Sequence, residues 1–167
     1  MNNHDKNMDN GKKILLDCGL FQGDVDNLEE LNSTWFFDPK EIDLLILSHA
    51  HIDHCGRIPK LVKDGFRGNI FSTHATRDLA SIMLMDTAHI QERDAQFHNE
   101  KMLAKLRTNK NYKGKLEERV PIYNSQDVVN SLKLFVGMSY DQLIEISPGI
   151  HLLFTDAGHI LVSASVN

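Results

Sequence analysis

The chain has 167 residues, long enough for one domain with a buried core, and its 41% hydrophobic and 25% charged residues are typical of a globular protein. Its longest apolar runs are too short to cross a bilayer, so we expect no membrane partner. A net charge of −5 argues against a strong, general attraction to nucleic acid. With only Cys18 and Cys55, the chain has no disulfide framework, which favours a reducing, cytoplasmic location.

The N-terminal half alternates polar segments with short apolar runs. Residues 1–12 are polar and rich in Asn, and we expect this segment to be disordered. Buried strands are predicted at 13–16 and 43–48, because each contains a continuous apolar run that ends at polar residues. A helix is expected over 59–65, which starts with proline and ends with glycine, and a further short strand over 69–72.

The C-terminal half begins with a long helical stretch from 75 to about 106, which we expect to break once. Its apolar residues Leu79, Ile82 and Ile90 recur at helical spacing, and the run 83–85 is interpreted as core packing. The segments that follow are a loop, a helix, a β-hairpin and a last strand, expected at 107–119, 126–135, 143–146 with 150–155, and from Ile160. Helices and strands interleave, so the fold class is α/β or α+β.

Charge is distributed unevenly along the chain. The segment from Lys101 to Arg119 contains seven basic residues and two acidic ones, so it carries +5 while the rest of the chain carries −10. Two interpretations stay open. A basic segment near a metal site can guide a phosphodiester backbone, whereas a solvated surface loop would need no function.

Residues 49–54 read His-Ala-His-Ile-Asp-His and directly follow a predicted buried strand. Neutral imidazole and carboxylate are ligands that zinc and related divalent ions accept. Side chains two apart on an extended chain share a face, so His49 and His51 can bind one ion together. Asp53 and His54 suit a turn around a second ion. A chance cluster of surface histidines is the alternative.

Two further residues extend this cluster. His159 lies in a loop between two predicted strands, and a third imidazole beside His49 and His51 would leave an open position for water, as in catalytic zinc centres. Asp17 follows the first buried strand and is placed to orient a ligand through a hydrogen bond. The remaining histidines have no such spacing, and surface or structural roles are expected for them: His4, His74, His89, His98 and His151.

The hexapeptide at 49–54 resembles the signature of the metallo-β-lactamase superfamily, whose members are mostly dinuclear zinc hydrolases with an αββα sandwich. The segments 16–23, 76–80 and 156–161 are similar to the β-CASP branch of that superfamily. That branch includes RNA-processing nucleases related to the endonuclease subunit of the cleavage and polyadenylation machinery. The resemblance implies an α/β fold, with a partial metallo-β-lactamase sandwich over 13–167.

The chain also departs from the family pattern. By the resemblance, Asp17 belongs to the first family motif, the hexapeptide to the second and His159 to the third. Family members have a pair of strands before the first motif, where this chain has the polar segment 1–11. The aspartate that bridges the two metals and the β-CASP cap domain have no counterpart in the sequence, and Val162 stands where glycine is usual. The resemblance therefore indicates a domain truncated at both ends, whose isolated activity is expected to be weak or absent.

The function expected from this resemblance is that of a zinc-dependent hydrolase that cleaves phosphodiester bonds in RNA. Catalytic roles are expected for Asp53 and Asp17. The expected metal ligands are His49, His51, Asp53, His54 and His159. Intact relatives hold two Zn²⁺ ions, and one tightly bound ion is expected here. Two alternatives stay open: a metal-binding fragment without turnover, and another hydrolase of the same fold, such as a thioesterase or lactonase.

Overall fold

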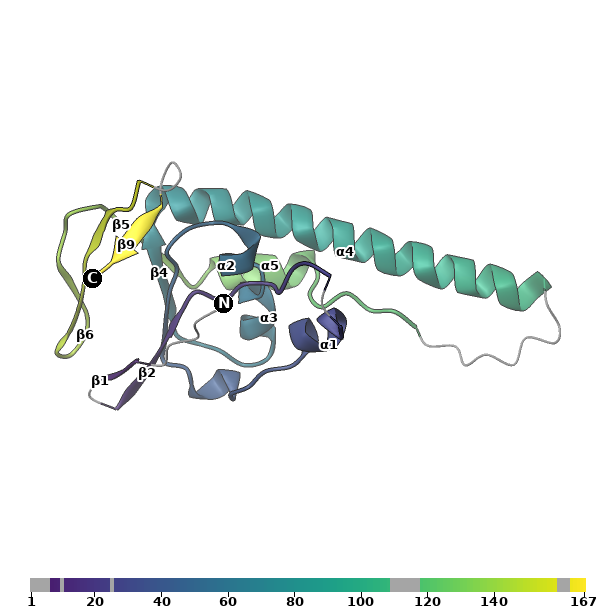
Figure 1. Ribbon diagram of the computed structural model, residues 1–167, viewed down its shortest axis with the longest axis horizontal. Helices are drawn as coiled ribbons and strands as arrows, with labels where there is room; N and C mark the ends of the chain where they lie inside the picture. The colour runs from purple at the N-terminus through teal and green to yellow at the C-terminus, as the bar shows by residue number, and fades with distance from the viewer. Residues whose placement is uncertain (1–6, 10, 25, 109–117, 159–162) are drawn as a thin grey trace.

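A five-stranded sheet forms the centre of the protein, in a computed structural model that describes residues 7–9, 11–24, 26–108, 118–158 and 163–167 (Figure 1). The strands lie in chain order: β1 (Asn7–Asp9), β2 (Lys12–Leu16), β3 (Leu44–Ile46), β4 (Asn69–Thr73) and β5 (Phe135–Met138). The β1–β2 pair is antiparallel, and the other three pairs are parallel. All three residues of β3 are buried, as expected of a strand that is covered on both faces.

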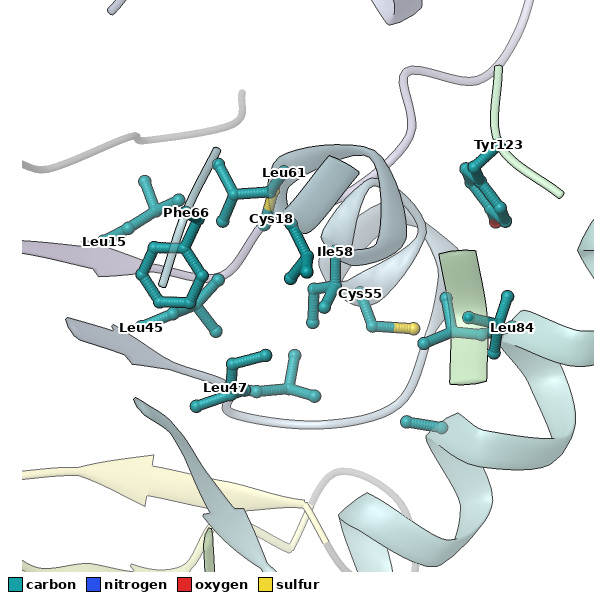
Figure 2. Close-up of a cluster of buried hydrophobic side chains, with 14 of the residues drawn as sticks. Leu15, Cys18, Leu45, Leu47, Cys55, Ile58, Leu61, Phe66, Leu84 and Tyr123 are labelled. Carbon is teal, nitrogen blue, oxygen red and sulfur yellow. The ribbon is translucent and has the colours of Figure 1, made fainter. Parts of the chain in front are cut away.

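Helices cover one face of this sheet. They are α1 (Leu28–Ser33), the 3₁₀ helix η1 (Pro39–Glu41), α2 (Ile52–Cys55), α3 (Ile58–Lys63), α4 (His74–Thr108) and α5 (Ser125–Leu132). Leu15 and Leu45 are fully buried in the core beneath them, and Figure 2 shows both beside Phe66. The parallel register places Leu15 opposite Leu45 and Leu45 opposite Ile70, so alternate residues of three strands face the helices together.

A second hydrophobic core lies on the other face of the sheet, where two pairs of antiparallel strands pack against it. These are β6 (Ile144–Ser147) with β7 (Ile150–Leu152), and β8 (Phe154–Asp156) with β9 (Ala164–Val166). Leu152 and Phe154 pack with Ile46 and Phe71 in this core. The backbone N–H of Ala164 donates to the carbonyl of Ser48 at 3.1 Å, so β9 is tied to the chain just beyond β3.

A buried arginine links the loop after β2 to α1. Arg57 is fully buried, and its Nε donates to the carbonyl of Gly19 at 3.0 Å, while Nη1 donates to the carbonyl of Leu31 at 2.9 Å. The guanidinium carbon lies 4.8 Å from the ring centroid of Phe21 and 4.5 Å from that of Trp35. Because its hydrogen bonds and ring contacts replace water, this charge is accommodated in the interior.

The predicted α/β class is confirmed, and three details of the prediction need correction. Strand β5 was missed, because the expected helix at 126–135 ends at Leu132 and the chain then pairs with β4. The long helix is continuous from His74 to Thr108 and is not broken. Asn7–Asp9 pairs with β2, so part of the segment expected to be disordered is a strand. The expected strand from Ile160 begins outside the described residues.

The long helix also buries a different face from the one its larger apolar residues suggested. Its buried residues are small or medium in size and recur mostly every fourth position: Thr76, Ala80, Leu84, Ala88 and Ala95. Leu79, Ile82 and Ile90 are exposed. Among the described helices, none is long and apolar enough to cross a membrane.

The start of β2 is joined to β3 by a charged clamp that predicts a pH-dependent stability. Asp43 accepts hydrogen bonds from the Lys12 ammonium at 2.8 Å and from the Lys13 backbone N–H at 2.9 Å. These bonds, the Lys12 bond first, hold the pKa of the Asp43 carboxyl below its usual range. A lowered folded pKa stabilises the protein above the unfolded value of about 3.9, and this stabilisation is lost as the pH falls through the folded pKa.

We therefore expect Asp43→Asn to lower the free energy of unfolding at pH 7 by on the order of 1 kcal/mol, since the side chain is partly exposed. The difference from the unmodified protein should shrink as the pH falls below about 4. Urea unfolding at pH 7 and at lower pH measures both effects, with Asp26→Asn in an exposed loop as the control. A difference that does not change with pH would contradict this assignment.

Candidate metal centre

The polar residues of the hexapeptide lie at one edge of the sheet, beside Asp17. Leu16 and Ile46 are register partners at the ends of parallel strands β2 and β3, so the residues that follow them emerge at the same edge. Asp17 comes directly after β2, and residues 49–54 come shortly after β3. Ligand sites of parallel sheets commonly lie at this carboxyl edge.

A close backbone contact holds α2 against the loop after β2. The N–H of Cys18 donates to the carbonyl of His54 at 2.6 Å. A Cβ atom on Gly19 would lie 1.6 Å from the carbonyl oxygen of Asp53, so a larger residue there would force the two segments apart. The absence of a side chain at Gly19 thus lets Asp53 and His54 approach Asp17.

The candidate donor atoms approach one another in two pairs. His49 Nε2 lies 3.0 Å from His51 Nδ1, and His54 Nε2 lies 3.6 Å from Asp53 Oδ2. The rings of His49 and His54 have centroids 3.9 Å apart, so the pairs are adjacent. Within the described part of the chain, no group of three or more His, Cys, Asp or Glu residues is arranged to hold one ion.

Asp17 accepts hydrogen bonds from both sides of this cluster. Its Oδ1 accepts from the Ser48 backbone N–H at 2.8 Å, and its Oδ2 accepts from the Ser48 hydroxyl and from His54 Nδ1, both at 2.8 Å. The residue has a φ of 56°, in the left-handed region that non-glycine residues seldom adopt. This conformation occurs where the side chain makes its contacts with two other segments of the chain.

These contacts determine which histidine nitrogens carry hydrogen. The one hydroxyl hydrogen of Ser48 is donated to Asp17, so its oxygen accepts from His49 Nδ1 at 2.9 Å. His54 likewise donates its Nδ1 hydrogen to the carboxylate. In the neutral rings, Nε2 of His49 and Nε2 of His54 therefore keep their lone pairs, as metal binding requires.

The ionisation of nearby groups follows from the same environment. The hydrogen bond to Asp17 raises the pKa of His54 above its ordinary value, against the opposing effect of partial burial. Burial raises the pKa of the Cys18 thiol to about 12 and also raises that of Cys55. Both thiols are buried and remain protonated near neutral pH, as is usual for cysteines that pack in a core.

The structure thus brings together five of the six residues predicted for the site: Asp17, His49, His51, Asp53 and His54. The sixth, His159, lies outside the described residues, and the roles of all six as ligands or catalysts stay predictions. The exposed His98 lies on α4 and the exposed His151 on β7. Sequence reasoning missed Ser48, because the carboxylate that its hydroxyl contacts belongs to a residue 31 positions earlier.

The sequence is similar to those of several known proteins. A model of the metallo-beta-lactamase superfamily matches residues 8–66. The chain is 33% identical over 157 residues to ribonuclease TTHA0252 of Thermus thermophilus, covering 93% of this chain and 29% of that protein. It is 31% identical over 153 residues to the transcription termination factor FttA of Methanosarcina mazei, covering 91% of this chain and 20% of the relative.

A third relative matches more closely over a shorter segment. The chain is 46% identical over 77 residues to the cleavage and polyadenylation specificity factor 73 of Drosophila melanogaster, covering 46% of this chain and 11% of that protein. The chain thus spans less than a third of the length of each of these three relatives.

The hydrogen-bond chain through Ser48 predicts a specific change in histidine protonation. In the metal-free protein, long-range ¹H–¹⁵N NMR should show His49 with its hydrogen on Nδ1. Ser48→Ala removes the acceptor, so we expect a mixture of the two His49 tautomers. Ser48→Thr retains a hydroxyl and is the matched control. An unchanged His49 tautomer in the alanine variant would contradict the proposed chain of hydrogen bonds.

Proposed function

Because this chain belongs to the metallo-β-lactamase superfamily, we propose that it is a zinc-binding hydrolase domain of the RNA-processing type, acting on phosphodiester bonds. The observation that carries the proposal is the pairing of His49 with His51 and of Asp53 with His54 at the carboxyl edge of the sheet. The relatives support the choice of RNA, since one is named a ribonuclease and another a cleavage and polyadenylation factor. The cytoplasmic location is also proposed, supported by the two free, buried thiols.

The donor set fits zinc in its chemistry. Imidazole nitrogens bind Zn²⁺ at about 2.0–2.1 Å, and the 3.0 Å separation of His49 Nε2 and His51 Nδ1 allows both to reach one ion. Zinc takes about four ligands, so two described donors per pair leave positions for water and for His159. In the metal-free arrangement His51 Nδ1 faces the lone pair of His49 and carries a hydrogen, which metal binding would displace.

The mechanism assigns a separate task to each carboxylate. The pairs His49–His51 and Asp53–His54 would hold the metal, which when bound would make hydroxide available near neutral pH, because zinc lowers the pKa of coordinated water to about 7. The side chain of Asp53 is 50% exposed, so it can contact a substrate and exchange a proton at its carboxylate oxygen. Asp17 is less exposed, at 21%, and holds the His54 ring in the orientation and tautomer that ligation needs.

Two alternatives have specific support. Among the described residues, the proposed metal ligands form pairs and no group of three or more, which favours a metal-binding domain without turnover. The fold alone also suits a thioesterase or lactonase, because the two pairs of proposed metal-binding side chains do not determine which substrate is bound. Of the basic segment proposed to guide RNA, Lys101 and Lys105 lie on α4, while residues 109–117 lie outside the described part of the chain.

The metal site can be tested by removing one proposed ligand. We expect His51→Ala to weaken zinc binding well beyond tenfold, since even an outer hydrogen-bond partner of a ligand is worth about 10–100-fold. Competition with a chromogenic zinc chelator measures the affinity and the number of ions per chain. One tightly bound ion is expected in the unmodified protein. His98→Ala on α4 is the control, and equal losses in the two variants would show that no defined site exists.

The reaction can be tested with three substrates offered to the zinc-loaded protein. We expect slow cleavage of single-stranded RNA, with no turnover of a thioester or a lactone. Asp53→Ala should reduce the RNA cleavage at least about 100-fold, as for loss of an acid–base group, while Asp94→Ala on α4 should leave it unchanged. Metal binding without any turnover would support the non-catalytic alternative, and preferential thioester or lactone hydrolysis would support the other hydrolase.

A further inference from the structure

The outward side of α4 carries large apolar residues. Ile82 and Phe97 are each 67% exposed, Ile90 is 42% exposed and Leu79 is 38% exposed. Exposed apolar side chains grouped on one helix commonly mark an interaction surface, whereas scattered ones need no explanation. Figure 1 shows α4 along one side of the molecule, with its C-terminal end extending beyond the sheet and the other helices.

Leu79, Ile90 and Phe97 belong to a regular seam, and Ile82 lies beside it. The outer seam consists of Leu79, Met83, Asp86, Ile90, Arg93 and Phe97, which follow one another at alternating intervals of four and three residues. This interval keeps side chains on one side of a helix and is the spacing through which two helices pack along their length. The seam lies away from the buried face of α4, which contains Ala80, Leu84 and Ala88.

The charges of α4 are separated along its length. Between residues 74 and 100 there are five acidic residues and two basic ones, which gives −3, and from 101 to 108 there are three basic residues and no acidic ones, which gives +3. A parallel neighbour of the same sequence would place like charges side by side. An antiparallel neighbour would place the basic end of each helix beside the acidic part of the other.

We propose that the outer seam binds the outer seam of a second copy of this chain, with the two α4 helices antiparallel. A two-fold axis between Arg93 and Asp94 places Ile90 against Phe97 of the second copy. The same register places Asp86 beside Lys101 of the second copy and Arg93 beside Asp94. Each contact occurs twice by symmetry. The Arg93–Asp94 pairs lie at the axis, the apolar Ile90–Phe97 pairs lie on either side of it, and the Asp86–Lys101 pairs lie beyond them.

This register specifies a charge-swap experiment. The unmodified protein should form a dimer in sedimentation equilibrium at micromolar concentrations. Asp86→Lys alone and Lys101→Asp alone each place like charges together and should weaken the dimer by roughly tenfold. The double variant D86K/K101D restores opposite charges and should recover most of the affinity. Asp26→Lys, in an exposed loop outside α4, should have no effect.

The apolar pair is tested separately. Ile90→Asp should abolish the dimer without lowering the melting temperature of the monomer, because the side chain is partly exposed and outside the core. Zinc affinity should be unchanged in all these variants, so the outcome is independent of the proposed activity. A monomer at 100-fold higher concentration, a dimer that tolerates Ile90→Asp, or a double variant that stays weak would overturn the proposal.

Discussion

The carboxylate of Asp17 accepts hydrogen bonds from the Ser48 backbone, the Ser48 hydroxyl and the His54 ring. Asp17 and these groups come from three segments: the loop after β2, the chain after β3 and helix α2. No single segment could position the cluster, because His49 depends on Ser48 and His54 depends on Asp17. The arrangement of the candidate site therefore follows from one carboxylate whose own backbone is held in an uncommon conformation.

The rest of the fold keeps that carboxylate and its partners in place. Gly19 allows α2 to lie against the loop after β2, and the buried Arg57 holds the same loop through the Gly19 carbonyl. Cys18 and Cys55 pack in the core directly beneath the site. Metal ligands must be held in a fixed orientation, and side chains that are supported by a packed core and by hydrogen bonds meet this requirement.

On the long helix α4, mostly small residues are buried and several larger apolar residues are exposed. Apolar spacing correctly predicted a helix, and Leu84 and Met85 of the run 83–85 pack in the core as expected. The other buried positions include the small residues Ala80, Ala88 and Ala95, whereas the larger Leu79, Ile82 and Ile90 are exposed. Small residues let α4 lie close to its neighbours. The larger apolar residues then remain on the outward side, where a second helix can cover them.

The superfamily could be recognised from the sequence, and the comparisons confirm it: a model of the metallo-β-lactamase superfamily matches residues 8–66, and one relative is named a ribonuclease. The strands at 13–16, 43–48 and 69–72 could also be predicted, since each is a local apolar run before polar residues. Strand β5 could not be predicted, because its conformation depends on pairing with β4. The roles of Ser48 and Gly19 were also decided only by the tertiary structure, since their partners lie more than 30 residues away and local patterns carry no information about such contacts.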